Sequence, residues 1–509
     1  MIDARDTLGR HEILLIGANG FLGKVLLAML LDRYPDFRRL HVVMRPKRRL
    51  SPEERFEREV LASPPLEAVL ERLGRERVAG RITVHPGDLG EPDCGLGEEA
   101  LEALAGRVGL VINCAGLVEF FPPVDDSFAT NVDGVEHVIG LARRLGAKLL
   151  HVSTCFVCGE ADGLIEESEP ILGFYPRRKG PRDQGFRHDR EIRYMRERIA
   201  EIYRAAGLNR GDRRPREVAQ KLSDLGLQRA YQWGWTNTYT YTKSLGEQLI
   251  AAEEDLEYTI VRPAIVEAAL DFPFPGWVEG GRTAAPLVMM AMSGLRHWAV
   301  REDAPMEVVP VDLAVSAIWI AAVMLLNGCA EKVYHVSTAH VNPIYYGDLI
   351  RLLYREYRRR RWRADGGFRL PVPPLGVRVL TPEEARRRGE LQQKTITRLQ
   401  QWATDTRRLM ERTGMPGVRS VRRLATRLRQ TGLRVMVRDQ ALDLYRPFMH
   451  DNRFIFESEN IRAAWRCLRE EDRRKLPWNP EEIDWEDYWI TREVEGVRKW
   501  VQAESALGV

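Results

Sequence analysis

The sequence predicts an α/β fold built on a doubly wound parallel sheet, because short apolar runs alternate with helical patterns and the first run ends in a glycine-rich turn. Residues 12–18 (EILLIGA) are apolar after Glu12, a helical pattern with an apolar face follows, and a second run, LHVVM, starts at Leu40. Strands that are apolar on both faces are typical of a parallel sheet covered by helices. The alternation continues with runs at Arg81 (RITVHPGD), Gly109 (GLVINCAG) and Lys148 (KLLHVSTCFV). We therefore expect a Rossmann-type sheet.

The middle of the chain interrupts this pattern. After Gly159, about eighty residues rich in Arg, Glu and Asp pass before the sheet pattern returns, and they include the helical stretch REIRYMRERIAEIYRAAG. They predict a helical insertion at about 160–235. The insertion is either a solvated elaboration or a lid over the substrate site.

The length of 509 residues exceeds one hydrophobic core, so we expect two domains. The sheet pattern resumes at Tyr258 (YTIVRPAIVE) and Lys332 (KVYHVSTA), whereas Arg-rich helical segments and a Trp-rich tail follow residue 350. The expected division is a Rossmann domain over 1–350 and a smaller, mainly helical C-terminal domain over 351–509.

Cysteines and apolar stretches indicate the cellular compartment. The six cysteines are sparse and the first residues lack an apolar signal core, as is typical of cytoplasmic proteins. Cys155 and Cys158 form a CxxC, but without a second pair or a His cluster we expect no metal site. The apolar part of 313–330 is too short to span a bilayer, so we expect no transmembrane helix. Peripheral contact with the inner membrane stays open, and we expect a homo-oligomer.

Charge is distributed unevenly along the chain. Residues 351–438 contain 24 Lys or Arg against seven Asp or Glu, although the net charge of the whole chain is only +4. A basic segment of this kind can meet an acidic face of its own protein, an anionic ligand, a lipid surface or nucleic acid. Of these partners, we do not expect nucleic acid. The arginines at 358–363 or those from Arg407 onward could meet the phosphates of an anionic ligand.

A GxxGxxG turn lies between the first apolar run and the first helical pattern, at Gly17, Gly20 and Gly23. Glycines are needed there because the turn is tight, the backbone approaches a cofactor pyrophosphate, and helix and strand pack closely. The following helix supplies free N–H groups and its positive dipole end. The turn therefore predicts a dinucleotide site.

The end of the second run favours NADPH over NADH. An NAD site usually carries an Asp or Glu there, but the stretch HVVMRPKRR has none. Instead Arg45, Lys47, Arg48 and Arg49 could pair with a 2′-phosphate. Asp88, in HPGDLG, follows the third run and can accept from an adenine amino group. The residues expected to bind the cofactor are Gly17, Asn19, Gly20, Phe21, Leu22, Gly23, Arg45, Lys47, Asp88, Leu89, Asn113, Ala115, Pro263 and Ile265.

Tyr239 and Lys243 lie one helical turn apart and therefore share a helix face. The Lys ammonium is expected to lower the phenol pKa from about 10, and the Tyr O–H can then give its proton to a carbonyl oxygen as hydride arrives. Thr154 follows a predicted strand, where doubly wound sheets bind their ligands, and can share that oxygen. Tyr241 has Leu245 where a lysine would be needed, so Tyr239 is the candidate proton donor.

At this point the chain resembles the fatty acyl-CoA reductases, in particular the bacterial alcohol-forming ones, over nearly its whole length. The resemblance rests on LLIGANGFLGK, VMRPK, HVSTCFVCG, WGWTNTYTYTKSLGEQL, TIVRPAIVEAAL, PGWVEG and EVVPVDLAVSAI, and in the tail on FESENIRAAW and EEIDWEDYW. It implies an extended short-chain dehydrogenase/reductase with a C-terminal helical domain and NADPH as cofactor. By motif, Thr154, Tyr239 and Lys243 match the family's catalytic residues.

The resemblance also implies a reaction. Long-chain fatty acyl-CoA would be reduced to the aldehyde with release of CoA, and the aldehyde to a primary alcohol, as in wax ester biosynthesis. The stretches PLVMMAM (from Pro286) and FPFPGW (from Phe272) could line an acyl tunnel or pack in the core. Three alternatives remain: a thioester reductase that stops at aldehyde or uses acyl carrier protein, a sugar-nucleotide epimerase or dehydratase, and a catalytically silent NADP sensor.

Overall fold

The computed structural model describes residues 1–47, 49–180, 183, 185–281, 284–364, 376–413 and 418–502. Seven strands form one sheet in the order β11-β7-β5-β4-β1-β2-β3. All of its neighbouring strands pair in parallel. The strands are β1 (Glu12–Ile16), β2 (Arg39–Met44), β3 (Ile82–Pro86), β4 (Val108–Asn113), β5 (Lys148–Val152), β7 (Tyr258–Pro263) and β11 (Val333–Val336). The predicted doubly wound Rossmann-type sheet is therefore confirmed.

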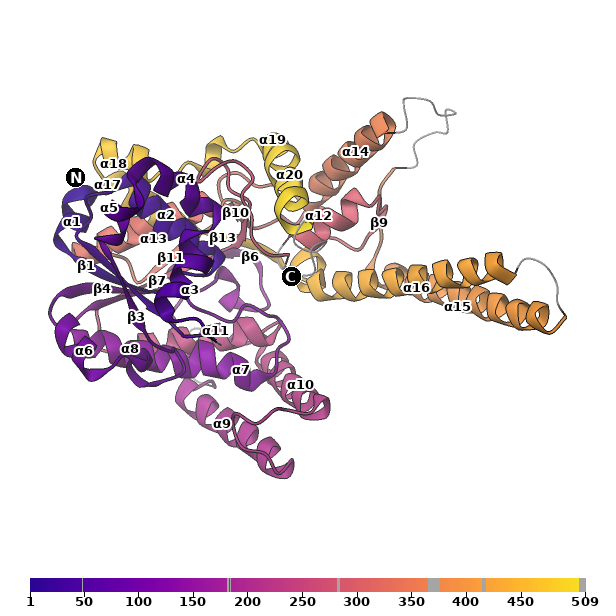
Figure 1. The fold of residues 1–509 in the computed structure, drawn as a ribbon, viewed down its shortest axis with the longest axis horizontal. Coiled ribbons are helices and arrows are strands. Elements are labelled where there is room, and N and C mark those ends of the chain that lie inside the picture. Colours follow the sequence, from indigo (N-terminus) through magenta and orange to yellow (C-terminus); the bar gives the residue numbers. More distant parts are fainter. Residues whose placement is uncertain are drawn as a thin grey trace. The chain divides into compact units, whose positions relative to one another are not determined.

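Helices cover both faces of this sheet (Figure 1). One face carries α2 (Phe21–Arg33) and α13 (Val311–Leu326), and the other carries α8 (Gly134–Leu145) and α11 (Thr238–Ala251). Fifteen of the sixteen residues of α13 are buried, so the longest apolar stretch of the chain is a core helix. In the part of the chain that the structure describes, no helix combines the length and apolarity that crossing a bilayer requires.

The insertion contains two helices, α9 (His188–Ala205) and α10 (Arg216–Trp233), as the sequence predicted for this stretch. Their apolar residues share a buried cluster with Tyr241 and Leu245 of α11. The Tyr241 hydroxyl donates to Glu191 of α9 at 2.5 Å, and Glu191 in turn pairs with Arg229 at 2.6 Å. The insertion is thus packed against the helix that carries Tyr239.

The strands differ from the sequence pattern in two places. The run from Lys148 is a strand only to Val152, because Cys155–Cys158 turns into a 3₁₀ helix that Thr154 caps. Short strands also occur after residue 350: β12 (Arg378–Val379) pairs with β9 (His297–Trp298), and β13 (Arg453–Phe456) pairs with β6 (Asp162–Ile165). Strands this short leave almost no periodic signal in a sequence.

The remaining elements are mostly short helices and turns. A further pair of strands joins β8 (Ile265–Glu267) to β10 (Val308–Pro310). The short α-helices are α1 (Ala4–Arg10), α3 (Pro52–Phe56), α4 (Pro64–Leu73), α5 (Arg75–Ala79), α6 (Glu98–Leu104), α7 (Val124–Phe128), α17 (Glu459–Cys467), α18 (Glu470–Lys475), α19 (Trp485–Asp487) and α20 (Val494–Gly496). Further 3₁₀ and π turns lie at Pro92–Gly95, Pro480–Glu482, Glu57–Leu61, Ala129–Asp133, Pro447–Asp451, Tyr488–Glu493 and Val497–Val501.

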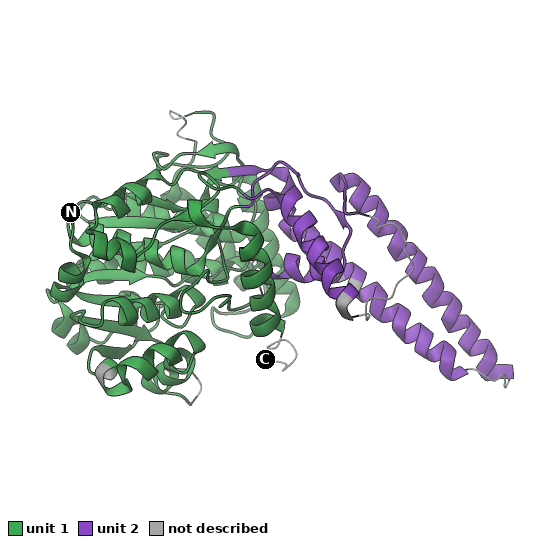
Figure 2. Ribbon diagram, turned by 90° about the horizontal axis from the view of Figure 1, so that it is seen from above, with its two compact units in different colours: residues 1–283, 307–343, 455–509 green, residues 284–306, 344–454 purple. Residues whose placement is uncertain are grey.

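The chain forms two compact units, coloured separately in Figure 2. Unit 1 comprises 1–283, 307–343 and 455–509, and unit 2 comprises 284–306 and 344–454. This division differs from the expected one at residue 350, because the pairing of β13 with β6 returns the tail to unit 1.

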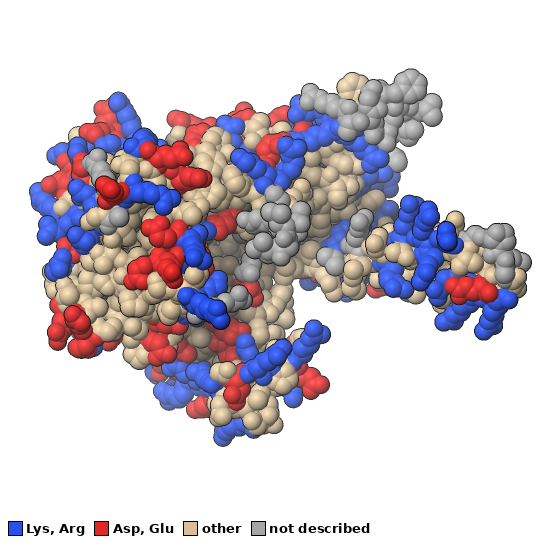
Figure 3. Space-filling model, in the orientation of Figure 1, with Lys and Arg blue, Asp and Glu red and all other residues tan. Residues whose placement is uncertain are grey.

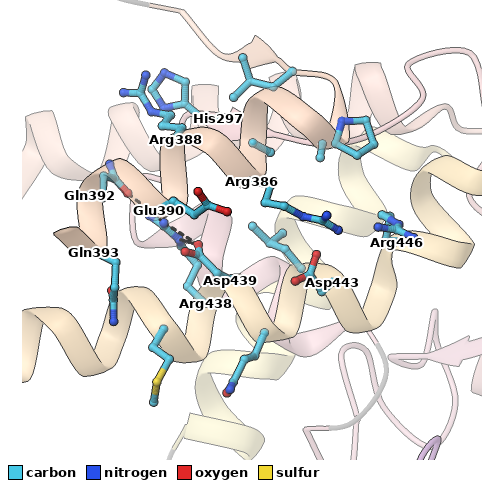
Figure 4. A pocket seen from close by; sticks show the side chains of 18 of the residues that line it. His297, Arg386, Arg388, Glu390, Gln392, Gln393, Arg438, Asp439, Asp443 and Arg446 are labelled. Atoms are coloured by element: carbon cyan, nitrogen blue, oxygen red, sulfur yellow. Dashed lines mark hydrogen bonds and ion pairs between the residues drawn. The ribbon is translucent and has the colours of Figure 1, made fainter.

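Unit 2 is mainly helical. Its α15 and α16 lie antiparallel as a hairpin: Gln400 donates to the carbonyl of Leu428 at 2.9 Å, and Arg438 donates to Gln392 at 3.0 Å. A cavity of about 330 Å³ lies at one end of this hairpin, lined by both helices and by His297 (Figure 4). The helices of the unit are α12 (Ala285–Met292), α14 (Tyr346–Ala364), α15 (Pro382–Thr413) and α16 (Val418–Arg446).

Candidate active site

The predicted site residues lie at one edge of the sheet, where its parallel strands end. The order of the strands reverses between β1 and β4, which is where doubly wound sheets bind nucleotides. Arg45 and Lys47 follow β2, Asp88 and Leu89 follow β3, Asn113 ends β4 and Ala115 follows it. Thr154 follows β5, Pro263 ends β7 and Ile265 begins β8, whereas Tyr239 and Lys243 lie on α11.

The glycine turn joins β1 to α2 and has the shape of a phosphate cradle. Gly17 has φ +92°, and a Cβ there would lie 2.7 Å from the backbone nitrogen of Ala115. A Cβ at Gly23 would lie 2.2 Å from the carbonyl oxygen of Gly17. At Gly20, the residue before α2, the nearest atom to a Cβ is 3.6 Å away. The turn is therefore tight inside but open at the helix start, as a bound pyrophosphate requires.

The basic residues after β2 are held by carboxylates from other elements. Arg45 pairs with Asp88 at 3.5 Å, and Lys47 pairs with Glu59 at 3.2 Å. Glu59 also accepts from Asn19 of the glycine turn at 3.4 Å. Burial raises the pKa of Glu59, but hydrogen bonds from Lys47 and Arg55 outweigh burial and hold the pKa below its ordinary value. Arg48 lies outside the described residues.

Asn131 fixes the loop that follows β4. Its side chain accepts from the N–H of Leu117 at 3.0 Å and donates to the carbonyl of Leu117 at 3.1 Å. It also donates to the hydroxyl of Thr242 on α11 at 3.1 Å. The loop beside the glycine turn is thereby tied to the helix of Tyr239 and Lys243.

Thr154 and Tyr239 lie close enough for the side chain of Thr154 to lower the pKa of the Tyr239 hydroxyl. Burial raises the pKa of Tyr239 to about 12, and the lowering by Thr154 offsets burial only in part. The expected lowering by Lys243 was therefore wrong in direction, because the cost of charging a buried phenol dominates. A protonated phenol at neutral pH is nevertheless the form that can donate a proton.

Lys243 lies at the end of a buried chain of hydrogen bonds. Its Nζ donates to the carbonyl of Val152 at 2.7 Å and lies 3.2 Å from Nε2 of His151. His151 Nδ1 lies 3.2 Å from the amide nitrogen of Asn113, whose oxygen accepts from the N–H of Ala115 at 3.1 Å. Burial lowers the pKa of Lys243 to about 8 and holds the pKa of His151 well below its ordinary value.

These hydrogen bonds assign the tautomer of the His151 imidazole. Because the oxygen of Asn113 is taken by a backbone N–H, its amide nitrogen faces His151 as a donor. His151 then accepts at Nδ1 and carries its proton on Nε2, toward Lys243. That tautomer stabilises the neutral amine of Lys243 relative to the ammonium, in the same direction as burial, but a pKa of about 8 keeps Lys243 mostly charged at neutral pH.

A buried ion pair joins the same helix to β7. Glu247, one turn beyond Lys243, pairs with Arg262 of β7 at 2.5 Å. Both side chains are almost fully buried, and they line a cavity of about 230 Å³ with Cys158 and Ser244. The charge of Glu247 raises the pKa of Lys243, opposing the effect of burial.

Three residues with contacts here were not among the predicted site residues: Glu59, His151 and Glu247. His151 carried a signal, since it is the one polar residue inside the strand sequence LLHV. Glu247 carried a weaker one, its spacing of one turn from Lys243. Glu59 carried none, because it reaches Lys47 and Asn19 from another element.

The other sequence features lie as follows. Cys155 and Cys158 are buried free thiols, and burial raises the pKa of Cys158 to about 12. The described residues contain no group of three or more His, Cys, Asp and Glu side chains suited to a metal ion. The stretch from Pro286 forms α12 of unit 2, and the loop from Phe272 belongs to unit 1.

The sheet, the glycine turn and the Tyr-Lys helix define an oxidoreductase of the extended short-chain dehydrogenase/reductase class, with a nicotinamide cofactor. The family model described as male sterility protein, an NAD-binding family, matches residues 15–318. The chain belongs to this family. Relatives of the chain are named fatty acyl-CoA reductases.

Two relatives come from Arabidopsis thaliana. "Probable fatty acyl-CoA reductase 5" is 30% identical over 72% of this chain and 74% of its own length. "Probable fatty acyl-CoA reductase 4" is 26% identical over 96% of this chain and 97% of its own length. The "Alcohol-forming fatty acyl-CoA reductase" of Simmondsia chinensis is 29% identical over 70% of this chain and 72% of its own length.

A solved structure is similar in fold. The reductase domain of a non-ribosomal peptide synthetase from Mycobacterium tuberculosis superposes with a TM-score of 0.51 and 17% identity, covering 99% of this chain and 95% of that one.

Proposed function

We propose that the protein reduces long-chain fatty acyl-CoA to the aldehyde, with release of CoA, and then to the primary alcohol, with NADPH as the hydride source. The observation that carries the proposal is the placement of Thr154 beside Tyr239 and the buried Lys243, at the edge of the sheet that also holds the glycine turn. The names of the relatives support an acyl thioester as substrate, and one of them is called alcohol-forming.

Tyr239, Thr154 and Lys243 have different roles at the carbonyl oxygen of the substrate. NADPH, when bound at the glycine turn, supplies a hydride to the carbonyl carbon. Tyr239 donates its proton to the oxygen as negative charge develops there, and Thr154 donates a second hydrogen bond. The pKa of about 12 keeps the Tyr239 phenol protonated and ready to donate. Lys243, held by Val152, places a positive charge beside this pair.

Release of CoA follows from the first reduction. The hemithioacetal carries a C–S bond, a C–O bond and the new C–H bond. The Tyr239 phenolate takes back the hydroxyl proton as the carbonyl re-forms and the C–S bond breaks, and the CoA thiolate takes up a proton from water to leave as the thiol. The aldehyde then presents a second carbonyl oxygen to the same Thr154 and Tyr239, and a second hydride gives the alcohol.

Arg45 and Lys47 support NADPH over NADH, because both are exposed cations at the end of β2. Glu59 beside Lys47 does not reverse this preference, since its charge is already balanced by Lys47 and Arg55. Michaelis constants for NADPH and NADH test the proposal. A clear preference for NADH would overturn it.

The substrate class is tested with a panel of acyl-CoA chain lengths and a matched acyl carrier protein thioester, following NADPH oxidation and analysing products. Turnover of long acyl-CoA, with aldehyde trapped when NADPH is limiting, is the expected result. Turnover of the carrier-protein thioester alone would make the protein a carrier-dependent reductase instead.

A further inference from the structure

The α15–α16 hairpin of unit 2 carries large apolar side chains in solvent. On α15, Leu391, Trp402 and Leu409 are 63%, 56% and 57% exposed. At about 3.6 residues per turn, the 18 positions from Leu391 to Leu409 make five whole turns, and Trp402 lies within about 20° of both. The three side chains therefore form one line along the helix, which we call the apolar row.

The apolar row is not the surface that holds the hairpin together. The face of α15 that meets α16 carries Ala403, which is fully buried, and Gln400, which donates to Leu428. Both positions lie about a third of a turn or more from the apolar row. The row is thus a second apolar face on a helix that already has its packing face, and a lone helix pair gains nothing by exposing it.

Positive charge borders the apolar row. Lys394, Arg398 and Arg412 fall within about 80° of the row on one side, by their spacing of three, seven and three residues from its members. Among the described residues none of these three cations has an ion-pair partner. Figure 3 shows Lys and Arg side chains gathered over the hairpin.

Acidic groups on this side are few. Asp405, three residues after Trp402, lies 3.9 Å from Arg408, which offsets its charge. Glu384, near the start of α15, accepts from the N–H of Thr381 and so caps the helix. The face therefore combines an apolar row with a net positive border, the pattern of a helix that lies in a membrane interface.

We propose that this face of α15 docks on the surface of an anionic phospholipid bilayer, with the apolar row inserted among the acyl chains and the cations at the head groups. Charge complementarity favours a bilayer over a second copy of the chain. In a symmetric dimer through this face, Lys394 and Arg398 would meet the same cations of the other copy. A nucleic acid would match the cations but would leave Leu391 and Leu409 without an apolar partner. The inference does not depend on the proposed reaction.

Vesicle flotation of the full protein tests it, with phosphatidylcholine vesicles against vesicles that also contain phosphatidylglycerol. The protein is expected to float with the anionic vesicles at low salt and less at high salt, because the cations act through screened charge. Leu409→Ser is expected to weaken binding several-fold and Trp402→Ser/Leu409→Ser at least about tenfold, because inserted apolar area is lost.

Leu433 on α16 provides a matched control, since it is also 57% exposed but lies off the apolar row. Leu433→Ser is expected to bind within about twofold of the unchanged protein. Thermal unfolding of every variant confirms that the hairpin remains folded. The proposal fails if the unchanged protein does not float with anionic vesicles, or if Leu433→Ser loses as much binding as Leu409→Ser. It also fails if light scattering shows a dimer that Leu409→Ser dissociates, which would make the row an interface between copies.

Discussion

Charged groups are held in opposite ways around α11 and along α15. On α11, Lys243 and Glu247 are buried, and each has a partner on a different element: the Val152 carbonyl and Arg262. On α15, ion pairs such as Glu383–Arg387 join residues one turn apart on the same helix, and both side chains are largely exposed. Removing one partner of a buried pair leaves the other charge buried without a counter-charge, which lowers the free energy of unfolding. Removing one partner of an exposed pair changes that free energy little. Substitution of a single charged residue should therefore have a large effect around α11. Along α15, the effect of charge should depend on the sum of many side chains.

The largest effect is expected for Tyr239→Phe, which removes the proton donor. The value of kcat/KM should fall about 10²- to 10⁴-fold, with binding of NADPH retained. Tyr241→Phe is the control, because Tyr241 lies on the same helix but donates to Glu191 in the insertion. It should lower the free energy of unfolding by about 1–3 kcal/mol and leave turnover of the folded protein nearly unchanged. Equal losses of turnover would make Tyr239 a structural residue.

The buried ion pair gives the next largest effect. Glu247→Gln leaves Arg262 without its counter-charge, so the free energy of unfolding in urea should fall by about 3–5 kcal/mol. Glu383→Gln, which breaks an exposed pair on α15, should change it by about 0.5 kcal/mol or less. Similar changes in the two variants would remove the contrast between the regions.

Cofactor preference depends on a partly exposed pair and should show an intermediate effect. Arg45→Ala should raise KM for NADPH about 10- to 100-fold, the loss expected for a charge-assisted hydrogen bond to a phosphate, and leave KM for NADH nearly unchanged. Arg45→Lys should recover part of the loss. An equal rise for both cofactors would show that Arg45 acts on the fold of the loop and not on the 2′-phosphate.

The smallest effect is a displacement along the pH axis. Since the pKa of Lys243 is about 8, its ammonium is lost as pH rises through that value, and kcat/KM should fall there. Ionisation of Tyr239 causes no further change of kcat/KM below pH 10, because its pKa lies near 12. His151→Phe removes the Nε2–H that favours the neutral amine of Lys243, so the fall of kcat/KM at alkaline pH should move to higher pH. A fall of kcat/KM that moves to lower pH would assign the other tautomer to His151.

The elements that the sequence predicted well have a local cause. Mostly apolar runs such as LLHV indicate strands buried on both faces. The glycine turn is recognised by Gly17 and Gly23, where the structure leaves no room for a Cβ. The helix α9 follows from its own amphipathic pattern. Each of these signals lies within one element.

What the sequence could not predict depends on contacts between distant segments. The direction of the Tyr239 pKa shift comes from burial by surrounding elements and not from the neighbouring Lys243. Glu59 meets Asn19 across 40 positions, and the pairing of β13 with β6 returns the tail to unit 1. No periodicity or motif reports such contacts.

The most direct test of the central claim is a count of NADPH oxidised per CoA thiol released, with long-chain acyl-CoA limiting and NADPH in excess. Two successive reductions at the Thr154–Tyr239 pair predict two NADPH per CoA and a primary alcohol as the product. Tyr239→Phe should slow both reductions together. One NADPH per CoA with accumulated aldehyde, or no oxidation with any acyl-CoA, would contradict the account.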